Sequence, residues 1–197
     1  MATLSFSSDG NYLASSGKDR RLCFWKNTSN GFILTKVIES AHKRIIWSVD
    51  FFSSKVLASG ARDGFVKLWN IVSNDGVIDL VKVSQFEPAL QRDSNEQNKK
   101  VEPVTAVAFA PTTVNNKMIL AIGMECGRIE VWAIDSLSNS CHHLIGFPHS
   151  SCHASSVKKL VWKPIIYEGK IEEHIHKFTL ASCGLDHGVR IFNINII

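Results

Sequence analysis

The stretch that decides the fold is "AHKRIIWSVDFFSSKVLASGARDGFVKLWN", residues 41–70. Apolar and polar side chains alternate in it, and Val, Ile, Phe and Trp are frequent, which is typical of β-strands separated by polar turns. The stretch also contains His42, Ser59 and Asp63, the three residue types of a hydrolase triad. It can therefore be a structural unit of strands or a catalytic site, and the rest of the chain distinguishes the two.

The same layout recurs along the chain. Small residues lead through a polar turn into an alternating strand in "SSGKDRRLCFWKN" (15–27), "SGARDGFVKLWNI" (59–71), "IGMECGRIEVWAI" (122–134) and "SCGLDHGVRIFNI" (182–194). A second alternating segment precedes each of them, at 4–10, 45–54, 104–113 and 157–164. The sequence therefore predicts a repeated all-β unit of about four strands.

The spacing of the units indicates the kind of repeat. The units close on Trp25, Trp69, Trp132 and Phe192, which are 44, 63 and 60 residues apart. The first spacing matches the period of roughly 40–45 residues in WD40 propeller blades. Polar insertions at 85–103 and 165–177 account for the longer spacings, and we expect both to be loops.

The predicted fold is all-β, a partial WD40 β-propeller of about four blades, with blades at about 1–39, 44–84, 103–147 and 156–197. The last blade lacks its outer strand. Four blades are too few for the usual closed ring, so we expect the chain to be the C-terminal part of a larger propeller. Uncovered blade faces and strand edges predict that the chain alone associates or is insoluble.

The hydrolase triad and a structural tetrad make different predictions, because a catalytic site occurs once and a structural network can occur in every blade. Ser15, Asp19 and Trp25 keep the same mutual spacing in the first blade, and Ser182 and Asp186 keep it in the fourth, with His153 upstream. We therefore predict a tetrad in which Asp63 accepts from His42, His42 meets the Ser59 hydroxyl, and the Trp69 indole completes the chain. The third blade has Ile122 and Cys126 at the serine and aspartate positions and cannot form this network.

A basic surface is the candidate for partner binding. In a propeller, the turn with the tetrad aspartate and the loop with the tetrad histidine emerge on one face. The side chains expected there, beside the channel mouth, are Lys18, Arg20, Lys43, Arg44, Trp47 and Arg62. They form either a solvated rim or a docking surface for an acidic partner or RNA phosphates.

Composition limits the other possibilities. The net charge of +4 permits an anionic partner without requiring one. No signal peptide and no run of about 18 apolar residues is present. Five irregularly spaced cysteines suit a reducing compartment. Cys141 and Cys152, in the His-rich segment 141–153, are too far apart for a typical zinc pair, so we expect no metal, cofactor or small-molecule substrate.

Five motifs carry a closer resemblance: "SGKDRRLCFWK", "AHKRIIWSVDF", "IGMECGRIEVW", "VKKLVWKP" and "LASCGLDHGVRI". Together, over essentially the whole chain, they resemble the C-terminal end of the Elongator complex subunit 2 family. The resemblance implies a non-catalytic scaffold in a complex that modifies wobble uridines of tRNA, in the cytoplasm and also the nucleus. It implies as partners the large scaffold subunit and the catalytic acetyltransferase subunit, with at most weak or indirect tRNA contact.

Overall fold

The computed structural model describes residues 3–74, 77–88, 101–164 and 176–196. The strands are β1 (Thr3–Phe6), β2 (Tyr12–Ser16), β3 (Leu22–Thr28), β4 (Gly31–Ile38), β5 (Ile46–Phe51), β6 (Val56–Ala61), β7 (Val66–Asn74), β8 (Val77–Phe86), β9 (Val104–Phe109), β10 (Lys117–Met124), β11 (Ile129–Asp135), β12 (Cys141–Gly146), β13 (Val157–Trp162), β14 (His176–Gly184) and β15 (Val189–Ile196). One short 3-10 helix, η1 (His149–Ser151), precedes β13. In the described part of the chain, no helix has the length and apolarity needed to cross a membrane.

The strands form four antiparallel sheets in which sequence neighbours pair. Three sheets have four strands each, and the fourth sheet has β13, β14 and β15. This confirms the predicted all-β class with about four blades, and within the described residues the last blade has no outer strand. The expected loop at 85–103 overlaps the end of β8, and its residues 89–100 lie outside the described residues. Most of the expected loop at 165–177 also lies outside them, and His176 and Lys177 begin β14.

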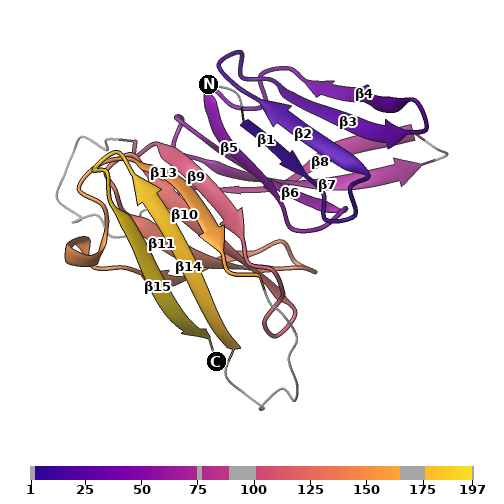
Figure 1. Cartoon of the computed structure of the whole chain (residues 1–197). Coiled ribbons are helices and arrows are strands. Elements are labelled where there is room, and N and C mark those ends of the chain that lie inside the picture. Colours follow the sequence, from indigo (N-terminus) through magenta and orange to yellow (C-terminus); the bar gives the residue numbers. More distant parts are fainter. Residues whose placement is uncertain (1–2, 75–76, 89–100, 165–175, 197) are drawn as a thin grey trace.

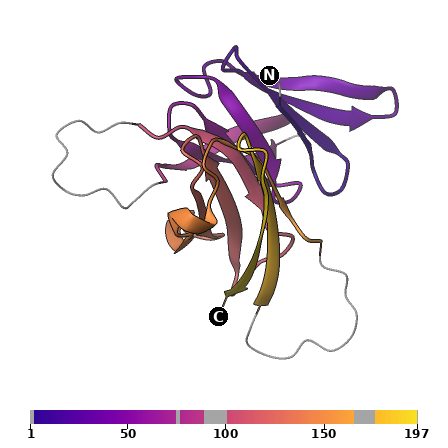
Figure 2. The same cartoon turned by 60° about the vertical axis from the view of Figure 1, so that its left-hand side comes forward.

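The first strands of the sheets lie at the centre of the molecule. β1 contacts β5, β5 contacts β9, and β9 contacts β13, so the inner strands follow one another in blade order (Figure 1). The remaining strands of each sheet extend outward from this row (Figure 2). The result is an arc of radially arranged sheets, as expected for part of a propeller.

Each sheet has two faces, and consecutive sheets pack front on back. The front face carries the closing aromatic residue of the unit, and the back face is the opposite one. Trp69 on the front of the second sheet belongs to the same buried cluster as Phe24 on the back of the first. Trp132 is likewise clustered with Leu68. Phe192 of the fourth sheet is clustered with the back of the third, so the core consists of three interfaces of one kind.

Two glycines allow this close packing. A Cβ atom on Gly60 would lie 2.5 Å from a methyl carbon of Val104, and one on Gly123 would lie 2.6 Å from a methyl carbon of Val157. Both glycines occupy the same position of the unit, on the back face of β6 or β10. The inner strand of the next sheet therefore approaches to a distance that a side chain at this position would prevent.

Gly123→Ala should destabilise the protein by about 1–3 kcal/mol, because the added methyl group overpacks the interface with Val157. Urea unfolding measures the change. Cys183 occupies the same position on the back face of the fourth sheet, where no described sheet packs, so Cys183→Val is the matched control and should change stability little. Equal losses in both variants would contradict the packing explanation.

Candidate functional site

The second sheet brings the four tetrad residues together. His42 lies in the loop before β5, Ser59 on β6, Asp63 in the β6–β7 turn and Trp69 on β7. The His42 Nδ1 atom is 3.1 Å from both Asp63 carboxylate oxygens, and its Nε2 atom is 2.8 Å from Ser59 Oγ. Trp69 Nε1 donates to the same Ser59 Oγ at 2.9 Å. All four residues are buried.

For a neutral His42, the donors and acceptors of the tetrad allow one arrangement of protons. The Asp63 carboxylate can only accept, so the unprotonated Nε2 atom of His42 accepts from the Ser59 hydroxyl group, whose oxygen accepts from the Trp69 indole. Nδ1 then carries the imidazole proton and donates it to the Asp63 carboxylate. Every polar group of the tetrad thus has a partner, which is what burial requires.

Ionisation agrees with this arrangement. Burial lowers the pKa of His42 and outweighs the hydrogen bond and charge of Asp63, so the imidazole stays neutral. Burial alone would raise the pKa of Asp63. Hydrogen bonds from His42 and from the backbone N–H groups of Lys43 and Phe65 outweigh it, and the net pKa is lowered. Asp63 is therefore an ionised carboxylate that ties the histidine loop to the turn.

The same trio does not provide a catalytic nucleophile. His42 and Ser59 have no exposed surface, so no substrate reaches the hydroxyl group. The Ser59 hydroxyl is also engaged by two partners in the tetrad. The buried network therefore braces the sheet, and the hydrolase alternative has no support in the geometry.

The first sheet forms part of the network. Trp25 Nε1 donates to Ser15 Oγ at 3.0 Å, as its counterpart does in the second sheet. Asp19 is exposed and accepts a bond of 3.3 Å from the backbone N–H of Arg21. The serine–indole pair is thus formed, while the aspartate acts only within its own turn.

The fourth sheet has a network with a different fourth member. His153 Nδ1 is 2.7 Å from Asp186 Oδ1, and its Nε2 atom is 2.7 Å from Ser182 Oγ. Phe192 supplies no indole, but Arg190 Nη1 lies 3.0 Å from Asp186 Oδ2 and 2.7 Å from His153 Nδ1. Although desolvation acts against it, hydrogen bonds from His153 and two backbone N–H groups hold the pKa of Asp186 well below its usual range. Sequence reasoning missed Arg190, whose only signal was its place two residues before the closing aromatic residue.

The third sheet satisfies its tryptophan in another way. Trp132 Nε1 donates to the buried carboxylate of Glu130 at 2.9 Å. Glu102, in the loop before β9, accepts from the backbone N–H of Cys126 at 2.7 Å. In the second sheet the turn residue Asp63 supplies the carboxylate, and the loop residue Lys43 supplies the N–H group. In the third sheet the loop supplies the carboxylate and the turn supplies the N–H group. Sequence reasoning, which searched for the missing serine and aspartate, did not find Glu130 or Glu102.

Three of the predicted cations gather next to the tetrad. Lys43, Arg44 and Arg62 are exposed and line a depression of about 440 Å³. Asp63 accepts from the backbone N–H of Lys43 at 2.8 Å, so the tetrad fixes the base of this depression. Glu125, from the third sheet, lines it as well. We call Lys43, Arg44 and Arg62 the basic rim.

The other three predicted residues lie elsewhere. Lys18 lines a separate depression in the first sheet, together with Asp19 and Arg21. Arg20 is exposed in the β2–β3 turn, with a positive φ of 67°. Trp47 lines the central cavity instead of the basic depression. Five of the six residues thus divide between two depressions and the cavity, and Arg20 lines none of the three.

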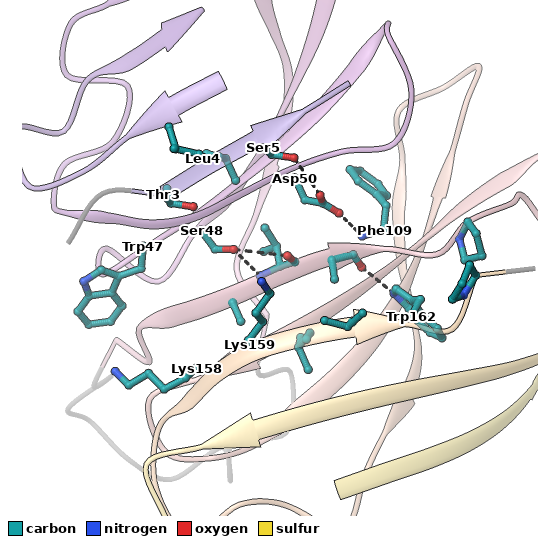
Figure 3. A pocket seen from close by; sticks show the side chains of 18 residues that line it. Thr3, Leu4, Ser5, Trp47, Ser48, Asp50, Phe109, Lys158, Lys159 and Trp162 are labelled. Atoms are coloured by element: carbon teal, nitrogen blue, oxygen red, sulfur yellow. Dashed lines mark hydrogen bonds between the residues drawn. The ribbon is translucent and has the colours of Figure 1, made fainter. Parts of the chain in front are cut away.

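The central cavity has a volume of about 740 Å³ and lies against the inner strands β1, β5, β9 and β13. Trp47 and Lys158 lie at the same end of it (Figure 3). Lys158 and Lys159, which are adjacent on β13, are exposed cations of the cavity wall. The sequence analysis did not select either lysine, since neither belongs to the tetrad turns.

Asp50 joins three sheets at this cavity. Its Oδ1 atom accepts from Ser5 Oγ of β1 at 3.2 Å, and its Oδ2 atom accepts from the backbone N–H of Phe109 in β9 at 2.7 Å (Figure 3). Desolvation raises the pKa of Asp50 to about 6, although these hydrogen bonds act in the opposite direction. Nearby, Ser48 Oγ accepts from the Val107 N–H at 3.1 Å. Side chains of β5 thus accept hydrogen bonds from backbone N–H groups at the inner edge of β9.

The His- and Cys-rich segment 141–153 forms β12, η1 and their connections. His153 is committed to the network of the fourth sheet. No three His, Cys, Asp or Glu side chains are grouped as a metal site within residues 3–74, 77–88, 101–164 and 176–196.

Asp63→Ala should lower the free energy of unfolding by about 3 kcal/mol, because it leaves His42 and the Lys43 N–H without their acceptor. Thermal or urea unfolding measures this. Asp19→Ala, at the same position of the first sheet, removes an exposed carboxylate that accepts one bond within its own turn, and should cost less than about 1 kcal/mol. An unchanged unfolding midpoint for Asp63→Ala would contradict the bracing role.

Asp50→Asn should become more stable relative to the unsubstituted chain as pH rises from 4.5 to 7. The folded-state pKa of Asp50 is raised, so the folded chain keeps a proton that the unfolded chain has lost, and stability falls as pH rises through about 6. Asparagine cannot ionise, so the difference should grow by no more than about 2 kcal/mol. Urea midpoints at the two pH values test this, with the exposed turn residue variant Asp9→Asn as control. Parallel curves for Asp50→Asn would overturn the assignment.

Comparison with known proteins shows which proteins the chain is similar to. The family model "WD domain, G-beta repeat" matches residues 2–26 and 34–70. Elongator complex protein 2 of Schizosaccharomyces pombe is 28% identical over 200 residues, covering 100% of this chain and 24% of the relative. The Dictyostelium discoideum protein is 31% identical, covering 98% and 22%, and the Homo sapiens protein 28%, covering 98% and 25%.

A solved structure supports the fold. The crystal structure of Saccharomyces cerevisiae Sqt1 matches 97% of this chain and 44% of its own, with a TM-score of 0.67 at 14% sequence identity. The chain spans about a quarter of the length of the curated relatives that it matches. The chain thus carries WD40 repeats at residues 2–26 and 34–70, and along nearly its whole length it is similar to part of Elongator complex protein 2.

Proposed function

We propose that the chain is a non-catalytic scaffold region of an Elongator complex. The observation that carries the proposal is its similarity to Elongator complex protein 2 of several organisms over 98–100% of its length. The relatives are about four times longer, so the chain corresponds to one part of such a subunit. That part consists of rigid sheets, a common basis for protein-interaction surfaces.

The geometry favours assembly over catalysis. The histidine, serine and aspartate that resemble a triad are buried in the bracing of the second sheet. Three exposed cations lie next to that bracing, and the tetrad holds the Lys43 backbone in place. A rigidly held charged rim suits recognition of an acidic partner surface, because little conformational entropy is lost on binding.

The partners in this proposal are the large scaffold subunit and the catalytic acetyltransferase subunit of the complex. Through them, the chain would support modification of wobble uridines in tRNA, in the cytoplasm and also in the nucleus. The chain itself would contribute position and rigidity, and no group of its own to the chemistry.

Direct RNA binding is the second candidate, and the basic rim favours it. Three exposed cations surround one depression, a geometry that can hold phosphate groups. The net charge of +4 is modest, however, and Glu125 also lines this depression. Protein–protein assembly is therefore the better supported function.

Affinity purification of the full-length protein that contains this chain, followed by mass spectrometry, tests the assignment. The expected result is recovery of the other Elongator subunits. The triple variant Lys43→Glu, Arg44→Glu, Arg62→Glu should lose at least tenfold in recovered partner, because it reverses the charge of the basic rim. The matched control Lys55→Glu, Lys163→Glu, Lys177→Glu changes the same charge at exposed positions outside the rim and should retain the partners.

The same variants separate the two candidates. If the rim binds RNA directly, the triple variant should weaken tRNA binding and reduce its salt dependence, while partner recovery stays normal. Unchanged recovery and unchanged tRNA binding would remove the rim from both functions. Absence of Elongator subunits from the purified wild-type sample would overturn the proposed function itself.

A further inference from the structure

The basic rim adjoins an apolar surface in the same depression. Besides the three cations, the depression of about 440 Å³ is lined by Phe65, Val101 and Pro103, which we call the apolar wall. Phe65 is half-buried, and Val101 is 46% exposed. A ligand held by charge alone, such as a phosphate group, would leave the apolar wall in contact with water. The depression is therefore suited to a ligand that has both an apolar part and an anionic part.

Two neighbouring sheets build this depression. The basic rim comes from the loop before β5 and from the β6–β7 turn, whereas Val101 and Pro103 belong to the loop before β9. Gly64 in that turn has a positive φ of 81°, and a side chain at this position would collide with Val101. The Arg62 N–H group donates to the Ile45 carbonyl group at 2.9 Å. The backbone around the depression is thus held in place before a ligand binds, which lowers the entropic cost of binding.

The cations of the basic rim are available to a ligand. Within the described residues, none of their three side chains has a hydrogen bond or an ion pair, whereas Arg21 of the first sheet is paired with Glu39 at 2.9 Å. Two carboxylates line the depression as well, and Asp63 is already engaged by its hydrogen bonds in the tetrad. Three cations therefore face one carboxylate outside the tetrad, Glu125, so the depression attracts anions.

We propose that the depression binds an acidic segment of a partner protein in which a large apolar side chain lies between carboxylates. The apolar side chain packs on Phe65 and Val101, and the carboxylates pair with the basic rim. Burial of the apolar side chain supplies affinity, while the charges direct the segment to the depression and fix its orientation. This rests on the proposed scaffold function, for which it gives the chemistry of the partner segment.

RNA fits the same surface less well. Its phosphate groups would meet the basic rim, but its bases bind by stacking on flat aromatic rings. Among the described residues that line the depression, Phe65 is the one aromatic side chain. Val101 and Pro103 offer no such ring. An acidic protein segment with an apolar side chain uses both halves of the depression.

Photocrosslinking in the full-length subunit, purified with its complex, tests which ligand occupies the depression. The photoreactive amino acid p-benzoylphenylalanine replaces Phe65, whose aromatic side chain it resembles. Leu137, which is 93% exposed in the β11–β12 turn, is the control position. Irradiation should join position 65, and not position 137, to a protein segment. Mass spectrometry should show acidic residues on both sides of a large apolar residue in that segment.

Three results would overturn this inference and leave the proposed scaffold function standing. They are a crosslink from position 65 to RNA, a crosslink to a segment of another composition, and no crosslink in an assembled complex. Absence of Elongator subunits from the purified sample would instead overturn the proposed function and the inference that rests on it.

Titration of the full-length subunit with a synthetic peptide of the crosslinked sequence separates the two halves of the depression. Val101→Ser should weaken binding about tenfold without changing its salt dependence, because it removes apolar contact alone. Arg62→Gln should weaken binding and reduce its salt dependence, because it removes one charge. Val81→Ser is the matched control, since Val81 on β8 is also 46% exposed and lies outside the depression.

The control should bind the peptide as the unsubstituted protein does. Equal binding by Val101→Ser would remove the apolar wall from the site and overturn the proposal, as would a salt dependence that Arg62→Gln leaves unchanged. Circular dichroism melts verify that the variants are folded.

Discussion

A small antiparallel sheet with two apolar faces cannot bury both of them by itself, and the rest of this structure follows from that constraint. The second, third and fourth sheets each use the front face to cover the back face of the preceding sheet. At the second and third of these interfaces the approach is close, which explains the glycines at 60 and 123. It also places the inner strands side by side, where Asp50 can bridge three of them. The chain is thus stabilised as a series of equivalent interfaces.

Much of the fold could be predicted from the sequence because its determinants are local. The alternation in 41–70 and the turn at Asp63 specify strands and their connections, and the recurrence of this pattern specifies repetition. The tetrad of the second sheet could also be predicted, since a serine and an aspartate recur four residues apart in the first sheet (Ser15 and Asp19) and in the fourth (Ser182 and Asp186). Asp50 could not, because its partners Ser5 and Phe109 lie 45 and 59 residues away and carry no shared motif. Lys158 and Lys159 could not be predicted either, because they come to line the central cavity when the sheets pack against one another.

The relation between bracing and surface explains where function belongs in this chain. Asp63 accepts from a buried imidazole and from the backbone of the loop that carries Lys43 and Arg44. The position of the exposed cations therefore depends on the buried network through the hydrogen bonds of Asp63. A substitution in the tetrad would move the basic rim as well as weaken the sheet, so loss of partner binding in such a variant would not by itself locate the contact.

The third sheet shows how such a unit can diverge. Its loop-to-turn tie persists although the carboxylate now belongs to the loop residue Glu102 and the N–H to Cys126. Its indole has likewise moved from a serine to Glu130. The second and third sheets share a hydrogen bond between the loop and the turn, and the donor and the acceptor exchange sides between them. Repeats of this kind should therefore be compared by pairs of positions that are hydrogen-bonded to each other. A comparison of single residues counts two mismatches here, although the hydrogen bond between the loop and the turn is present in both sheets.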